Sequence, residues 1–130
     1  MPSIFTKIIN GEIPCYKIAE DEDNFAFLDI NPNAKGHTLC VPKKEVDRLL
    51  DLDEESYLKL MAFSRKVGQA IEAAVPCKRV GMSVIGLEVP HVHVHLIPLQ
   101  DMKNATFQYK ESLTAEAFEQ VAEQIRGALK

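Results

Sequence analysis

Cysteine is scarce in this sequence, and the few cysteines form no recognisable pattern. Cys15, Cys40 and Cys77 are odd in number and far apart, and no Cys-x-x-Cys pair occurs. This spacing favours neither a disulfide framework nor a zinc knuckle. No apolar run approaches the roughly 18 residues that span a bilayer, and no basic region followed by an apolar one marks a signal peptide. We therefore expect a soluble, reduced, cytoplasmic protein with no membrane partner.

The sequence also lacks an excess of positive charge. Lys and Arg number 15 against 19 Asp and Glu, which gives a net charge of -4. A general nucleic-acid-binding protein has a basic face, so nucleic acid is not an expected partner. Hydrophobic residues make up 46% and charged residues 26% of the chain, as in globular rather than disordered proteins. The 130 residues are predicted to form a single domain, residues 1–130, whose core is large enough to be stable without disulfides or bound metals.

Helical periodicity and strand-like runs alternate along the chain. A short helix is predicted from Ser3 to Ile9, and a long amphipathic helix from its Asp53 cap to the residue before Pro76. A final helix is predicted over 114–129, capped by Thr114. Strands are predicted at 16–19, 24–28, 37–41, 79–85 and 91–96. The expected fold class is α+β: a five-stranded, mostly antiparallel sheet with one long central helix and a C-terminal helix.

Three of the four histidines lie within five residues, in the last predicted strand. Alternate side chains of a strand point to opposite faces, so His91, His93 and His95 are expected to share one face. Val92 and Val94 then point the other way, into the core. Three titratable side chains on a strand that otherwise resembles core are unfavourable unless they are solvated, hydrogen-bonded to partners or required for a function.

Three interpretations of this stripe are open. An exposed face could carry three histidines without a function. A metal site could take two histidines of the strand together with His37, although His91 and His95 lie about 13 Å apart and cannot easily share one ion. In the third interpretation, a neutral imidazole is the nucleophile toward phosphorus or an acyl centre, and its neighbours fix its tautomer and bind the anionic substrate.

The residues around this strand resemble a known family. The segment Val89–Pro98 resembles the His-φ-His-φ-His-φ signature of the histidine triad (HIT) proteins, where φ is an apolar residue. Four more segments resemble, in the same order, the histidine triad nucleotide-binding branch: Ile4–Ile9, Glu12–Pro14, Phe27–Pro32 and His37–Lys44. Together these segments cover nearly the whole chain up to Pro98, and it is their combination that makes the resemblance specific.

The resemblance implies a HIT-like fold, a homodimer in which two five-stranded sheets join, and a purine nucleotide site without a catalytic metal or cofactor. His93 corresponds to the nucleophile that attacks the α-phosphate and becomes nucleotidylated, after which water releases the nucleoside monophosphate. His95 corresponds to the residue that hydrogen-bonds the phosphate. His91 and His37 correspond to histidines that orient this centre.

The resemblance also implies how the nucleoside is bound. Asp29 corresponds to the carboxylate that accepts hydrogen bonds from the two ribose hydroxyls. The apolar slot for the base corresponds to Phe5, Ile8, Ile13, Phe27, Ile30 and Leu39. Without the resemblance, most of these apolar residues would be predicted to be core.

The sequence departs from the family pattern directly before the histidines. The family has an Asn, a glycine-containing loop and then Gly-Gln-x-Val-x-His, whereas here the loop is several residues short. Ile85 stands in place of the Asn and Leu87 in place of the Gln, so amides that contact the phosphate and leaving group are missing. Glu88 adds a negative charge that repels phosphate unless it points away. The helix predicted over 114–129 is a second departure, because this branch often ends soon after the histidine strand.

The leading hypothesis is a purine nucleotide-binding hydrolase that cleaves nucleoside phosphoramidates or similar nucleotidyl conjugates through His93. A first alternative is a dinucleoside polyphosphate hydrolase, which the lack of a Lys/Arg cluster near the histidines in sequence disfavours. A second alternative is a nucleotide-binding protein with weak or no catalysis, which the missing amides favour.

Overall fold

The computed structural model describes residues 2–130 as an α+β fold built on one antiparallel sheet. The strand order is β1-β2-β3-β5-β4, and every neighbouring pair is antiparallel. The strands are β1 (Lys17–Glu20), β2 (Asn24–Leu28), β3 (Thr38–Pro42), β4 (Arg79–Ser83) and β5 (Val94–Leu99). The helices are α1 (Ile4–Ile9), η1 (Leu49–Asp51), α2 (Glu54–Ala74), η2 (Met102–Ala105) and α3 (Ala115–Ala128). The predicted fold class is confirmed.

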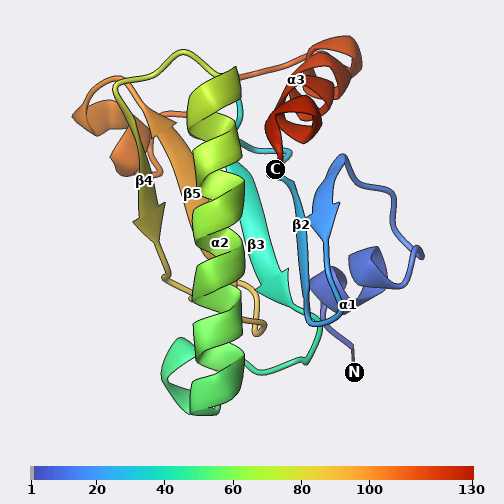
Figure 1. Ribbon diagram of the computed structural model, residues 1–130. Coiled ribbons are helices and arrows are strands. Elements are labelled where there is room, and N and C mark those ends of the chain that lie inside the picture. Colours follow the sequence, from blue (N-terminus) through green and yellow to red (C-terminus); the bar gives the residue numbers. More distant parts are fainter. Residues whose placement is uncertain (1) are drawn as a thin grey trace.

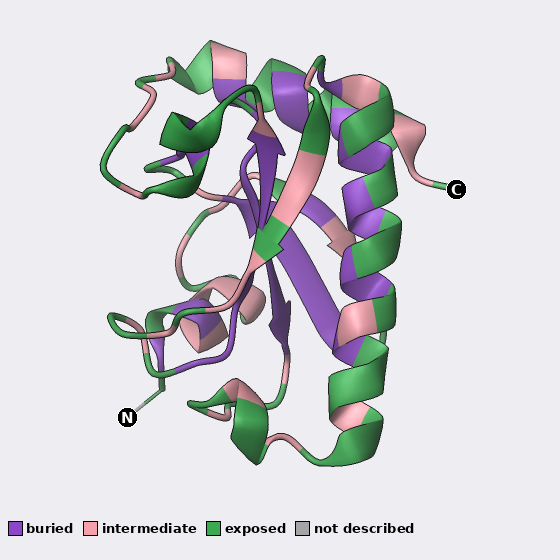
Figure 2. Cartoon of the chain, turned by 90° about the vertical axis from the view of Figure 1, so that its left-hand side faces the viewer, coloured by how far each residue is buried: buried purple, intermediate pink, exposed green. Residues whose placement is uncertain are grey.

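Helix α2 crosses one face of the sheet (Figure 1). It begins where the sequence predicts, because the Asp53 side chain accepts a hydrogen bond from the Ser56 backbone N–H at 3.1 Å. Its buried side chains recur at helical spacing and face the sheet, as the purple stripe in Figure 2 shows. Helix α3 is capped by Thr114 and packs against α2 and β1. Together α2 and α3 cover the larger of two apolar cores.

The opposite face of the sheet carries a second, smaller core beneath α1. Phe5 of α1 packs there against Phe27 at a ring-centroid distance of 5.5 Å, together with Phe25, Leu39 and Val41. Residues of β3 and β5 alternate between the two faces, so Cys40 and Val94 join the larger core while Leu39 faces α1. The helix at residues 4–9 therefore helps to build one face of the sheet.

The histidine segment is the main departure from the predicted elements. The strand expected at 91–96 begins only at Val94 and runs on to Leu99. Before Val94 the backbone groups have other partners: Val92 N–H donates to Val46 O at 2.8 Å, and the His91 carbonyl accepts from the His93 side chain. The strand expected at 79–85 likewise ends at Ser83. The two short helices η1 and η2 were not predicted.

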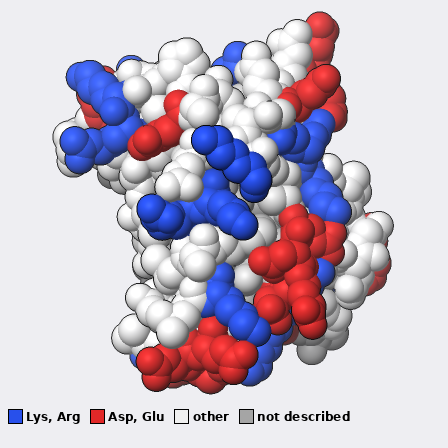
Figure 3. Space-filling model, viewed as in Figure 1, with Lys and Arg blue, Asp and Glu red and all other residues white. Residues whose placement is uncertain are grey.

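Charge on the α2 face is mixed in sign. Figure 3 shows Lys and Arg side chains interspersed with Asp and Glu on this face. Among the helices that the structure describes, none has the length and apolar character that crossing a membrane requires.

Candidate active site

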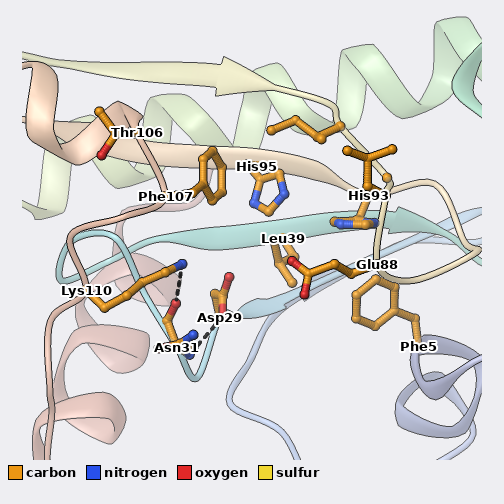
Figure 4. A pocket seen from close by; sticks show the side chains of 13 residues that line it. Phe5, Asp29, Asn31, Leu39, Glu88, His93, His95, Thr106, Phe107 and Lys110 are labelled. Atoms are coloured by element: carbon orange, nitrogen blue, oxygen red, sulfur yellow. Dashed lines mark hydrogen bonds between the residues drawn. The ribbon is translucent and has the colours of Figure 1, made fainter.

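A cavity of about 420 Å³ lies beside the histidine segment (Figure 4). Its walls come from α1, from the β2–β3 connection, from the loop between β4 and β5, and from the chain that follows β5. The lining side chains are Phe5, Asp29, Asn31, Leu39, Ile85, Leu87, Glu88, His93, His95, Thr106, Phe107 and Lys110, with Gly86. Two of the predicted triad histidines, His93 and His95, thus reach the same cavity as the predicted ribose carboxylate, Asp29.

The protonation of His93 follows from its hydrogen bond. Its Nδ1 lies 2.8 Å from the carbonyl oxygen of His91. A carbonyl can only accept, so Nδ1 carries a proton and Nε2 is the ring nitrogen left for a substrate. The Phe5 ring packs edge-on against the imidazole at a centroid distance of 5.0 Å and holds its orientation. His93 therefore presents an oriented Nε2 to the cavity, and an imidazole nitrogen of this kind can act as a nucleophile.

The protonation of His95 is set by a chain of hydrogen bonds that begins at the backbone. The Asn33 N–H donates to Nδ1 of His37 at 2.9 Å, so the proton of His37 is on Nε2. That nitrogen lies 2.9 Å from Nδ1 of His95 and donates to it. The proton of His95 is therefore on Nε2, which makes this ring an N–H donor at the cavity wall. We call this chain the Asn33–His37–His95 relay.

Burial keeps the relay uncharged. Desolvation is the largest cause that lowers the pKa of His37 to about 2, and the neighbouring His95 adds to it. Desolvation also lowers the pKa of His95 to about 4. Both rings are therefore neutral near pH 7, as the hydrogen bonds of the relay require.

His91 lies outside the cavity and supports the His93 ring from behind. The ring is fully buried, and its Nε2 donates to the Pro42 carbonyl at 2.7 Å. Its Nδ1 accepts from the Ser3 hydroxyl at 2.6 Å. Glu45 anchors this arrangement, because its carboxylate accepts from the Ser3 backbone N–H at 2.7 Å and from the Thr6 hydroxyl at 2.6 Å. The cluster holds in place the His91 backbone carbonyl, which accepts the hydrogen bond from Nδ1 of His93.

Asp29 follows β2 and is half-buried at the cavity wall. One carboxylate oxygen accepts from the Asn31 N–H at 2.8 Å, and the other lies 3.6 Å from Nε2 of His37. Burial raises the pKa of Asp29, while the Asn31 N–H and the nearby Lys110 ammonium lower it. The remaining lone pairs of this carboxylate are available to a diol.

Asp29, His37 and His95 also form a cluster whose ligand atoms lie within 4.8 Å of one another. The hydrogen bonds do not suit a cation there. Ligation through Nε2 of His37 would need its proton to move to Nδ1, where the Asn33 N–H already points. Because two N–H groups would then face each other, the cluster fits the neutral relay better than a metal site.

The predicted base slot is only partly assembled at the cavity. Phe5 and Leu39 line it, whereas Phe27 is buried beneath Phe5 in the smaller core. The other three predicted residues lie outside the cavity wall: Ile8 and Ile13 are half-buried, and Ile30 is 73% exposed. The base contacts therefore remain a prediction.

The loop before the histidines forms one wall of the cavity. This is the loop in which the resemblance led us to expect side-chain amides that the sequence lacks. Gly86 has a positive φ of 73°, which turns the chain there. Ile85 and Leu87 line the cavity without a side-chain donor, and Leu87 is 90% exposed. Glu88 also lines the cavity, and Figure 4 shows its carboxylate on the side of Asp29 and Leu39. Its negative charge is thus not directed away from the site.

Three lining residues, Thr106, Phe107 and Lys110, were missed by the sequence reasoning. They follow η2 in a segment without hydrophobic periodicity, so pattern alone does not place them at the cavity. A local signal exists in Asp101 and Asn104, which form a capping box and turn the chain back after β5. That signal predicts a turn after β5, but it does not predict that the residues after the turn reach the cavity.

Comparison with known proteins gives consistent matches along the chain. The model of the HIT domain matches residues 10–102. An uncharacterized HIT-like protein of Borreliella burgdorferi is 36% identical over 133 residues, covering 94% of both chains. The adenosine 5'-monophosphoramidase of Schizosaccharomyces pombe is 40% identical, covering 75% of this chain and 74% of that one. The crystal structure of a Hit-like protein from Bartonella henselae superposes with a TM-score of 0.86 at 33% identity, covering 98% of this chain and 96% of that one.

Proposed function

Because this chain belongs to the HIT family, we propose that it is a purine nucleotide hydrolase that cleaves nucleoside phosphoramidates or similar nucleotidyl conjugates. The observation that carries the proposal is the pairing of two imidazoles in one cavity, each held in a fixed orientation by a hydrogen bond at Nδ1. His93 presents its Nε2 and His95 presents an N–H. The two yeast relatives named adenosine 5'-monophosphoramidase, at 37% and 40% identity, support this substrate class.

In the proposed reaction, Asp29 accepts the ribose hydroxyls and holds the α-phosphate between the two imidazoles. Nε2 of His93 attacks phosphorus and forms an N–P bond as the bond from phosphorus to the leaving nitrogen breaks. That nitrogen keeps the electron pair and departs as an amine after taking a proton from solvent. The N–H of His95 donates to the phosphoryl oxygen on which charge develops. Water then cleaves the nucleotidyl–His93 bond, which yields the nucleoside monophosphate and regenerates the neutral imidazole.

The wall of the cavity favours one alternative. Ile85 and Leu87 replace neutral donors with hydrocarbon, so charge that develops on the phosphoryl group lacks the stabilisation that such donors supply. A nucleotide-binding protein with weak turnover is the second candidate function for this reason. In that case, the nucleotide binds while little monophosphate is released.

The decisive experiment is AMP release from adenosine 5'-phosphoramidate in the presence of EDTA. We expect steady release that EDTA does not diminish, because the proposed reaction uses no metal. Diadenosine polyphosphates at equal concentration should be cleaved more slowly. Tight AMP binding without turnover of either substrate would instead favour the binding role.

We further propose that the chain forms a homodimer through the β4 edge of the sheet. Strand β4 has a free edge and half-buried or exposed residues throughout. Beside it, α2 and β4 enclose a partly apolar cavity of about 440 Å³, whose lining includes Met61, Gly68, Val80 and Met82. The buried Ser83 hydroxyl has no hydrogen-bond partner within residues 2–130. A second copy could pair with this edge and cover the apolar side chains.

The oligomeric state is tested by light scattering coupled to gel filtration. We expect a dimer for the unmodified chain and a monomer for Met82→Asp, because the substitution places a charge on the proposed interface. Met102→Asp is the matched control, since Met102 is 77% exposed on η2 and lies outside that surface. A monomeric unmodified chain would contradict the proposal.

A further inference from the structure

The end of the cavity opposite His93 carries features that neither the nucleophile nor the ribose carboxylate explains. Thr106, Phe107 and Lys110 form this end, on the chain that follows β5. We propose that these residues form a subsite for the leaving group, and that Lys110 selects conjugates whose leaving group carries a negative charge. The proposal rests on the hydrolysis proposed above and specifies its substrate class.

The position of this subsite follows from the direction of attack. Displacement at phosphorus places the attacking and leaving atoms roughly in line, on opposite sides of the phosphoryl group. In Figure 4, His93 and Phe5 stand at one end of the cavity, His95 stands between the two ends, and Phe107, Lys110 and Asp29 stand toward the other end. A phosphoryl group beside His95 therefore expels its leaving group toward Phe107 and Lys110.

The Lys110 ammonium is held in place by neutral partners. It donates to the Asn31 carbonyl at 3.1 Å and to the Asn33 side-chain oxygen at 2.8 Å. Neither partner neutralises its charge, and no carboxylate within residues 2–130 forms a direct ion pair with it. An ammonium has three N–H groups, so one remains for a ligand. The side chain also lies over the Phe107 ring at 5.1 Å from the centroid, which limits its mobility.

Phe107 has a backbone conformation that is unfavourable for a bulky residue. Its φ of 64° lies in the left-handed region, and no other non-glycine residue of the described chain has a positive φ. Such a conformation persists only where the surroundings enforce it, and it is concentrated at ligand sites. Here it brings the ring edge-on to His95 at a centroid distance of 4.8 Å. The aromatic wall is thus built against a residue of the proposed catalytic centre.

The segment that carries the subsite is anchored to the loop after Asp29. Asn33 and Asn104 exchange two hydrogen bonds, from each side-chain amide to the backbone carbonyl of the other, at 2.9 and 3.3 Å. The Glu111 N–H donates to the Pro32 carbonyl at 2.8 Å. These bonds fix the wall before any ligand arrives, so its charge is preorganised.

The distribution of charge in the cavity indicates that a negatively charged leaving group is preferred. Asp29 and Glu88 are the carboxylates among the lining residues, and Lys110 is the lining cation, near Asp29 and on the opposite side of the cavity from His93. A negative group on the leaving side therefore meets an ammonium there. A carboxylate or a phosphate on the departing amine fits this requirement.

The test compares two uncleaved ligands that differ only in the charge of the leaving group. AMP is joined through a P–N bond to glycine in one ligand and to glycinamide in the other, and binding is measured by calorimetry with His93→Ala to prevent cleavage. We expect the glycine conjugate to bind about fivefold more tightly at low salt. In the double variant with Lys110→Met, the ratio of the two dissociation constants should fall to about one.

Three comparisons make the result specific. Lys103→Met is the matched control, because Lys103 lies over the Tyr109 ring and does not line the cavity, so the preference should survive. Lys110→Arg keeps the charge and should keep the preference. Added salt should weaken the preference of the parent, which gives a readout that does not depend on the folding of a variant.

Equal affinity of the His93→Ala protein for the two ligands would overturn the proposed subsite. A preference for the glycine conjugate that survives in the double variant with Lys110→Met would overturn it as well. Turnover answers a separate question. If the unmodified chain releases no AMP from adenosine 5'-phosphoramidate, the proposed hydrolysis fails, while the ratio of affinities still decides whether Lys110 selects the leaving group.

Discussion

Replacing His93 with alanine is expected to lower AMP release from adenosine 5'-phosphoramidate by at least about 1,000-fold, because the attacking nitrogen is lost. The neighbouring histidines cannot take its place. His91 has both ring nitrogens in hydrogen bonds outside the cavity, and Nδ1 of His95 accepts from His37. The measurement is kcat/KM by chromatography of released AMP, with EDTA in every sample.

The control is nucleotide binding by the same variant. His93 contacts the Phe5 ring, so its removal opens some space at the wall without removing Asp29 or His95. We therefore expect His93→Ala to keep an AMP affinity within about tenfold of the parent. Release at the parental rate would show that another group attacks phosphorus, and the assignment of the nucleophile would be wrong.

Acidification is expected to destabilise the protein through His37 by roughly 3 kcal/mol near pH 4.5. The folded state holds the pKa of His37 at about 2, mainly by desolvation, well below the ordinary histidine value of 6.5. Below about pH 6.5 the unfolded chain therefore takes up a proton that the folded chain does not, so stability falls as pH drops through that value toward 2. Above it, both states carry a neutral ring and the effect vanishes.

Urea unfolding near pH 7.5 and near pH 4.5, for the parent and for His37→Gln, measures this effect. The parent should lose roughly 3 kcal/mol more than the variant between the two conditions, because only the parent has this ring. His95, whose pKa is lowered to about 4, adds a loss in the same direction in both proteins, whereas the raised pKa of Asp29 opposes it. An identical pH dependence in the parent and the variant would show that His37 is solvated and titrates normally.

The sequence predicts the three α-helices and the succession of strands along the chain well, because their signals are local. The Asp53 and Thr114 caps and the apolar periodicity of the long helix need only neighbouring residues, and the structure confirms them. The start of the last strand is different. Whether His91 belongs to the strand depends on Pro42 and Ser3, which are far away in the chain, so periodicity alone extended the strand too far.

The candidate site likewise has residues that the sequence predicts and residues that only the fold reveals. The alternation of His93 and His95 and the position of Asp29 are visible in the sequence, and the structure brings all three to one cavity. Phe107 and Lys110 are not visible, because their approach to the site depends on how an irregular segment folds back after β5. The tautomers are also invisible, since they follow from hydrogen bonds across the sheet.

Asn33 bonds to both halves of this site, and that has a consequence for exchange between relatives. Its backbone N–H sets the tautomer of His37, and its side chain bonds to Asn104 and Lys110. The cavity wall and the protons of the Asn33–His37–His95 relay therefore share one anchor and are not separable modules. A chimera that takes residues 101–113 from another family member would need residues 31–33 from the same donor, because a mismatched pair would leave buried amides unpaired and loosen the relay.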